Sequence, residues 1–94
     1  EVGSCFTVTA MGNVSIYDVA VNNYAKNCFE GMYNSIIVGD GITISEHANT
    51  SGDSCNVTYG TVIRLSNADL GAREVNRYSL QNGTVEINGV QVNE

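Results

Sequence analysis

His47 is the only histidine of the chain, and it lies in the polar segment SEHANTSGDS. A Ser/His/Asp arrangement around it would have to recruit Asp40 or Asp53 as the acid. The nucleophile would be a serine such as Ser51 or Ser54, yet no serine stands in a GxSxG turn. The ten acidic residues form no readable pair of the kind that hydrolyses glycosides. The sequence therefore predicts a protein without enzymatic activity and assigns no catalytic residue.

Two acidic loops have a composition that a hard cation favours. GDG at 39–41 and SGDS at 51–54 place the carboxylates of Asp40 and Asp53 among glycines and free carbonyl groups. Neither loop matches the EF-hand pattern, and turn-forming glycine and aspartate account for both. Asp40 and Asp53 are weak calcium candidates, and no metal or other cofactor is predicted.

Tyrosines are the other candidate binding residues, because an aromatic ring can stack on a sugar while its hydroxyl group bonds to a polar partner. Tyr59 and Tyr78 fall on the expected core faces of strands. Tyr24 and Tyr33 lie in polar segments instead, so these two are the weak ligand-binding candidates.

The cysteines and asparagines favour an exported protein. Cys5, Cys28 and Cys55 lack the CxxC spacing of a zinc site and, outside the cell, predict one disulfide and one spare thiol with the pairing left open. In a reducing compartment they would instead be three small buried side chains. Four sequons supply glycosylation candidates, at Asn13, Asn49, Asn56 and Asn82.

Length and charge predict a single domain that neither binds nucleic acid nor spans a membrane. The 94 residues predict a single domain, 1–94. The net charge is −6 with only four basic residues, so the phosphates of a nucleic acid would be repelled. No apolar run approaches the roughly 20 residues of a membrane span. The chain starts at Glu1 rather than at Met, which is typical of a processed or excised chain.

The last third of the chain predicts a three-stranded antiparallel meander over 78–93. Asn82-Gly83 and Asn88-Gly89 are both strong signals for two-residue hairpin turns. Turns at both positions place all the apolar side chains of this segment on one face. These side chains are Tyr78, Leu80, Val85, Ile87, Val90 and Val92.

Alternating apolar and polar residues predict further strands upstream. The segment 55–66 alternates over its whole length, and 36–44 is expected to form a hairpin closed by Gly-Asp-Gly. The predicted fold is therefore mainly β, a small antiparallel β-sandwich of about seven strands.

Two alternative folds remain open. A helix at about 15–31, with Ser15 and Asp18 resembling a capping box, would give an α+β domain. As a strand, the same segment changes phase at Tyr17-Asp18 and needs a bulge there. The second alternative is a parallel β-helix, because apolar phrases recur at spacings of 21, 22 and 26 residues. Only four coils would form, and hairpin geometry at 82–92 argues against such winding. The phrases begin at Asn13, Asn34, Asn56 and Asn82.

Without a recognisable chemical site, the chain is predicted to be an extracellular or cell-surface structural or interaction domain. We expect a subunit of a surface appendage, envelope or virion, which assembles through its β-edges with further copies or with another surface protein. Residues 5–11 and 90–93 are the expected open edges, and a chain without proline cannot use proline to protect them. The alternative is a carbohydrate-binding or adhesion module.

Overall fold

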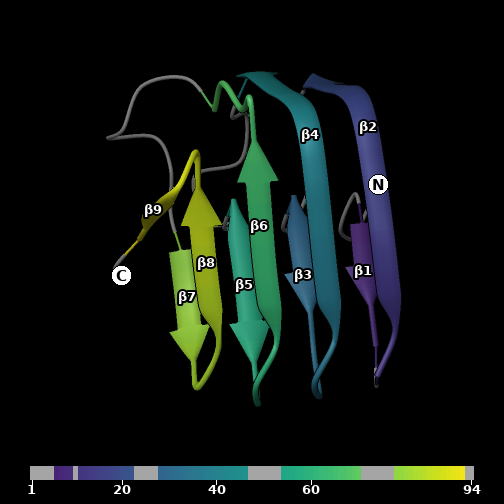
Figure 1. Cartoon of the computed structure of the whole chain (residues 1–94), viewed down its shortest axis with the longest axis vertical. Helices are drawn as coiled ribbons and strands as arrows, with labels where there is room; N and C mark the ends of the chain where they lie inside the picture. The colour runs from purple at the N-terminus through teal and green to yellow at the C-terminus, as the bar shows by residue number, and fades with distance from the viewer. Residues whose placement is uncertain (1–5, 10, 23–27, 47–53, 71–77, 93–94) are drawn as a thin grey trace.

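The computed structural model describes residues 6–9, 11–22, 28–46, 54–70 and 78–92, and these contain nine β-strands and no helix. The strands form two sheets that lie face to face (Figure 1). The prediction of a mainly β fold is thus confirmed. A helix at 15–31 is wrong for the described part of that segment, because 13–22 and 29–31 are strands.

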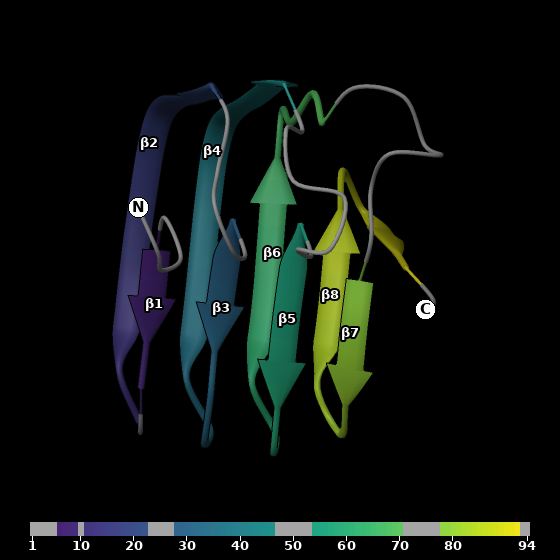
Figure 2. The same cartoon turned by 180° about the vertical axis from the view of Figure 1, so that it is seen from behind.

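Each sheet takes every second strand of the chain. The first sheet has the order β1 (Phe6–Val8), β3 (Phe29–Gly31), β5 (Cys55–Thr58), β7 (Tyr78–Gln81). The second has the order β2 (Asn13–Asn22), β4 (Ile36–Glu46), β6 (Val62–Ser66), β8 (Thr84–Ile87), β9 (Val90–Gln91). The view from behind shows the same succession (Figure 2). The chain therefore winds as four stacked coils, each with one strand in either sheet.

The predicted antiparallel sandwich is wrong in strand direction, because all pairs except β8–β9 are parallel. Up to β8, each strand is followed by one in the facing sheet instead of by one beside it. Neighbours within a sheet consequently come from successive coils and run the same way. The two-layer arrangement was predicted correctly, and the connections were not.

The predicted meander is half right. At Asn88-Gly89 the backbone is left-handed in both residues, with φ of 51° and 83°, and β9 folds back on β8 with Ile87 opposite Val90. At Asn82-Gly83 the chain instead crosses between sheets. Tyr78 is therefore the register partner of Cys55 in the first sheet and does not lie beside Ile87.

Left-handed residues also bend the long strands. The predicted hairpin at 36–44 is wrong, since β4 runs unbroken through Gly41, which has φ 74°. Asp18 has φ 53° at the same level of β2. The bulge expected at Tyr17-Asp18 is not found, because the register with β4 is unchanged from Tyr17 to Val19 and shifts only between Val21 and Asn22. A Cβ on Gly41 would stand 2.6 Å from Oδ1 of Asp18, so only glycine fits beside this aspartate. Figure 1 shows β2 and β4 curving over together at this end.

The core fills the space between the sheets with stacked rows of equivalent residues. One row passes from Phe6 through Phe29 and Cys55 to Tyr78, in steps of 23, 26 and 23 residues. The rings of Phe6 and Phe29 stack with centroids 5.3 Å apart. The parallel winding of the β-helix alternative is thus confirmed, and its repeat length was nearly right. Its phase was not, because Asn13 lies beside Ile36 rather than beside another asparagine. The objection from hairpin geometry was wrong at Asn82-Gly83, where the chain crosses between sheets.

Candidate functional site

The candidate calcium and catalytic residues do not form a site in the described part of the chain. Asp40 is exposed, and its Oδ1 accepts a 2.8 Å hydrogen bond from Nδ2 of Asn67. No group of three or more His, Cys, Asp or Glu is placed to hold a metal ion among the described residues. Asp53 and His47 lie outside those residues.

The two described cysteines belong to the core. Cys28 and Cys55 are buried thiols rather than members of a disulfide, and Cys55 follows Phe29 in the inward row of the first sheet. The predicted disulfide is therefore not found at these two residues. Cys5, the third candidate, lies outside the described residues.

Three of the four sequons fall in the described part of the chain. Asn13 and Asn82 are exposed, at the start of β2 and at the last corner, and Asn56 is half-buried on β5. Asn49 lies outside the described residues. Asn13 and Asn82 are therefore the more accessible acceptors, and glycosylation remains a prediction.

A pair of stacked tyrosines occupies the corner where the first sheet passes into the second. Tyr33 and Tyr59 stand in successive coils with ring centroids 5.2 Å apart and planes within 4° of parallel. They are 52% and 55% exposed. We call Tyr33 and Tyr59 the tyrosine stack. The other ligand-binding candidate, Tyr24, lies outside the described residues.

Backbone geometry aligns the tyrosine stack. Tyr33 and Asn34 have φ of 56° and 60°, and Tyr59 and Gly60 have φ of 48° and 81°, so the same tight turn is repeated in two coils. The N–H of Asn34 donates to the carbonyl oxygen of Tyr59 at 2.9 Å, and the N–H of Met11 donates to that of Tyr33, also at 2.9 Å. These bonds hold successive turns directly above one another.

Sequence reasoning identified Tyr33 but wrongly placed Tyr59 on a core face. The alternation over 55–66 does not belong to one strand, because the chain turns at 59–60 between β5 and β6. The signal for this turn was Gly60 directly after Tyr59. Each ring covers one face of the other, so a ligand cannot stack on those two faces.

The second candidate surface is the edge of β2. This ten-residue strand ends the second sheet, with β4 as its only partner among the described strands. The predicted edges are also found, since β1 ends the first sheet and β9 ends the second, but these strands have only three and two residues. The longest edge was missed, because 15–31 was also read as a helix.

The first half of β2 has no device that protects a sheet edge from pairing. Its sequence, NVSIY at 13–17, lacks charge, proline and glycine. The N–H of Ile36 donates to the oxygen of Gly12 at 2.9 Å. Because backbone groups of alternate residues point to opposite edges, those of Asn13, Ser15 and Tyr17 point away from β4.

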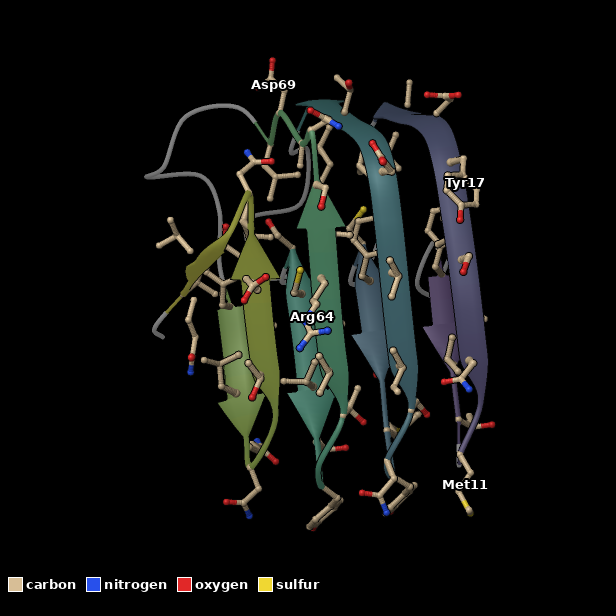
Figure 3. The ribbon with its side chains drawn as sticks, in the orientation of Figure 1. Met11, Tyr17, Arg64 and Asp69 are labelled. Atoms are coloured by element: carbon tan, nitrogen blue, oxygen red, sulfur yellow. The ribbon has the colours of Figure 1, made fainter. Side chains whose placement is uncertain are left out.

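Apolar side chains accompany this edge on the outer face of the second sheet. Tyr17 is 66% exposed, and Ile36 and Val38 of the neighbouring strand are 41% and 39% exposed. Figure 3 shows Tyr17 on β2, with Met11 at the foot of that strand and Arg64 on β6 towards the middle of the sheet. The edge therefore offers apolar area to a partner, together with backbone groups that no other described strand pairs.

Among the described residues no helix has the length and apolar character needed to cross a membrane. No protein-family model, no curated protein and no solved structure shows significant similarity to the chain. The function is therefore inferred from the geometry of the β2 edge and of the tyrosine stack.

Proposed function

We propose that this chain is an extracellular structural or interaction domain that associates with a second copy through the edge of β2. The observation that carries the proposal is the uncharged stretch Asn13–Tyr17 at the end of a parallel sheet. A subunit of a surface appendage, envelope or virion uses such an edge to add a strand from a neighbour.

The edge is complementary to itself in antiparallel orientation. A two-fold axis at Ser15 sets Asn13 opposite Tyr17 of the second copy, and Val14 opposite Ile16. No charged side chain of this segment meets a like charge, since NVSIY has none. Val14 is half-buried and Ile16 is buried in one copy. Pairing would extend the core side of the second sheet across both copies.

The bend at Asp18 limits the length of the interface. The left-handed backbone there turns the strand out of the plane of residues 13–17, and a carboxylate follows directly on the pairing segment. A partner strand therefore matches five residues, with Tyr17, Ile36 and Val38 beside it. This short strand pair favours a specific dimer over sheet-by-sheet aggregation.

The test compares two lysine substitutions on the same face of the same sheet. Ser15→Lys places a charge on the edge strand and, in the proposed dimer, directly beside its own copy. Ser66→Lys is the matched control, because Ser66 is exposed at the end of β6, which has a neighbour on either side. A glycan on Asn13 would block this edge, so the test uses protein without glycans. Sedimentation equilibrium is expected to give dimers for the native chain and for Ser66→Lys, and monomers for Ser15→Lys. A native chain that stays monomeric at high concentration would falsify the proposal.

A second candidate function is carbohydrate binding or adhesion at the tyrosine corner. It is favoured by the exposure of Tyr33 and Tyr59 and by Met11, 80% exposed in the corresponding turn of the first coil. Asparagine is the suitable substitution, because Asn82 holds a left-handed backbone at the equivalent corner with φ 63°. We expect a glycan array to show ligands for the native chain and none for the variant with Tyr33→Asn and Tyr59→Asn. An array on which the native chain finds no ligand removes this candidate.

A further inference from the structure

The tyrosine stack holds two accessible phenol rings side by side, an arrangement that favours oxidative coupling. The ring centroids of Tyr33 and Tyr59 are 5.2 Å apart, the planes are within 4° of parallel, and about half of each residue is exposed. Asn34 N–H bonds to the carbonyl oxygen of Tyr59, so the backbones are already joined at this level. A single copy of the chain therefore holds the two phenol rings face to face.

We propose that Tyr33 and Tyr59 form a modification site at which a peroxidase, using hydrogen peroxide, joins the two rings as dityrosine. The cross-link would connect the second and third coils at their exposed corner. It requires only one copy of the chain and is therefore independent of association through β2.

The chemistry balances with one molecule of peroxide. Each phenol loses one electron and its hydroxyl proton, which gives two phenoxyl radicals. The radicals combine through the carbons ortho to oxygen and form one carbon–carbon bond. Each of these carbons then releases its hydrogen as a proton while each oxygen regains one, so both phenols are restored. The two electrons and two protons removed overall reduce the peroxide to two water molecules.

The other described tyrosines do not offer this geometry. Tyr17 is 66% exposed on the outer face of β2, but no aromatic ring stacks on it among the described residues. Tyr78 is half-buried in the inward row that contains Cys55 and Phe29. Exposure and a parallel ring partner coincide only at the tyrosine stack in the described part of the chain.

Phenylalanine variants test the proposal without removing the ring contact. The full chain is treated with peroxidase and hydrogen peroxide, and dityrosine is followed by its fluorescence and by the mass of the intact chain. For the native chain we expect the mass to fall by two hydrogen atoms without dimer formation on a denaturing gel. Peptide mapping should join the segments that contain Tyr33 and Tyr59. Tyr33→Phe and Tyr59→Phe should each lose this product, whereas Tyr17→Phe should retain it.

Heat denaturation supplies a second measurement. A bond between residues 33 and 59 restricts the unfolded chain, so the oxidised native protein should unfold at a higher temperature than the untreated protein. Oxidised Tyr59→Phe should show no such rise. The proposal is overturned if the native chain gives no intramolecular dityrosine, or if the mapped cross-link excludes either member of the tyrosine stack. Loss of the cross-link would leave the sedimentation of the native chain unchanged, so the two proposals fail separately.

Discussion

The side-chain amide of Asn88 bonds both backbone groups of Ala68: the N–H of Ala68 donates to Oδ1 at 2.9 Å, and Nδ2 donates to the carbonyl oxygen of Ala68 at 2.8 Å. The amide thus takes the place of a peptide group in a neighbouring strand. Such a substitute is needed because the main chain turns away at Asn88-Gly89 to form β9. On the other side, the backbone of Asp69 bonds to Ile42 and Ile44 of β4.

Because of these two hydrogen bonds, Asn88 should contribute more than Asn82 to the free energy of unfolding. Asn88→Asp replaces the donating amide nitrogen with a carboxylate oxygen that faces a carbonyl oxygen. We expect the free energy of unfolding to fall by about 1–2 kcal/mol, as for a lost hydrogen bond that leaves an unsatisfied partner. Urea denaturation would measure the change.

Asn82→Asp is the matched control for that substitution. Both positions have positive φ, which aspartate tolerates as asparagine does. The Asn82 side chain is exposed and makes no hydrogen bond to another described residue. Its change should stay within about 0.5 kcal/mol. Equal losses for the two variants would contradict the role given to the Asn88 amide.

Spontaneous deamidation should be faster at Asn82 than at Asn88. The reaction begins when the backbone nitrogen of the following glycine attacks the side-chain carbonyl carbon, so the amide must be free to rotate. Asn88 is held by two hydrogen bonds, and Asn82 stands exposed at a corner. During incubation at mildly alkaline pH, peptide mapping should detect aspartate and isoaspartate at 82 well before 88. Faster conversion at 88 would count against this ordering.

Ser35 joins the first two coils from inside the corner. It is fully buried, and its hydroxyl oxygen lies 2.5 Å from the carbonyl oxygen of Thr9 and 2.6 Å from that of Met32. Ser35→Ala should lower the free energy of unfolding by about 1–3 kcal/mol, because a partly buried carbonyl group loses its donor. Thermal unfolding followed by circular dichroism would measure it. Ser66→Ala, at an exposed serine of β6, should change it by no more than about 0.5 kcal/mol.

Phe29 is the largest fully buried side chain among the described residues and stacks on Phe6. Phe29→Ala removes the ring from both the core and the stack and should cost about 3–5 kcal/mol. Phe29→Leu keeps most of the volume and should cost about 1–2 kcal/mol. Denaturant titration of both variants checks the prediction. Similar losses for Ala and Leu would mean that ring stacking, rather than filled volume, dominates at this site.

The strand content and the last hairpin could be predicted because both depend on local chemistry. Alternation marks a strand in any sheet, and Asn-Gly supplies two left-handed residues where β8 turns into β9. The turn fixes the register there, so Ile87 opposite Val90 was confirmed. The open edges expected at 5–11 and 90–93 were confirmed in that β1 ends the first sheet and β9 ends the second.

The path between the sheets could not be predicted from alternation. In a flat meander the apolar residues of β7 and β8 would share one face. In two facing sheets the apolar residues of β7 and β8 point towards each other across a shared core. Both arrangements require the same alternation of apolar and polar residues in the sequence. Turn chemistry at Asn82-Gly83 did not decide between them either, because only Asn82 is left-handed there. The parallel pairing depends on contacts more than twenty residues apart, such as Tyr78 with Cys55.

Of the two candidate surfaces, only Tyr33 could be predicted, because only Tyr33 has a recognisable local sequence feature. Tyr33 lies in a polar turn and was identified, whereas Tyr59 was hidden in an apparently continuous strand. The edge of β2 has no signature of its own, because an edge is defined by the absence of a neighbour. That property emerges only when all the coils are stacked.

The reversal of β9 gives the stack of coils a direction of growth. At the β2 end, another strand can add in either orientation. At the other end of the second sheet, β9 presents two residues that run against every other strand, so a further parallel coil has no matching template there. In polymer terms, the second sheet has a reactive end at β2 and a terminated end at β9. Two such chains joined at their β2 edges form a pair of fixed stoichiometry, because the second sheet then ends in β9 on both sides.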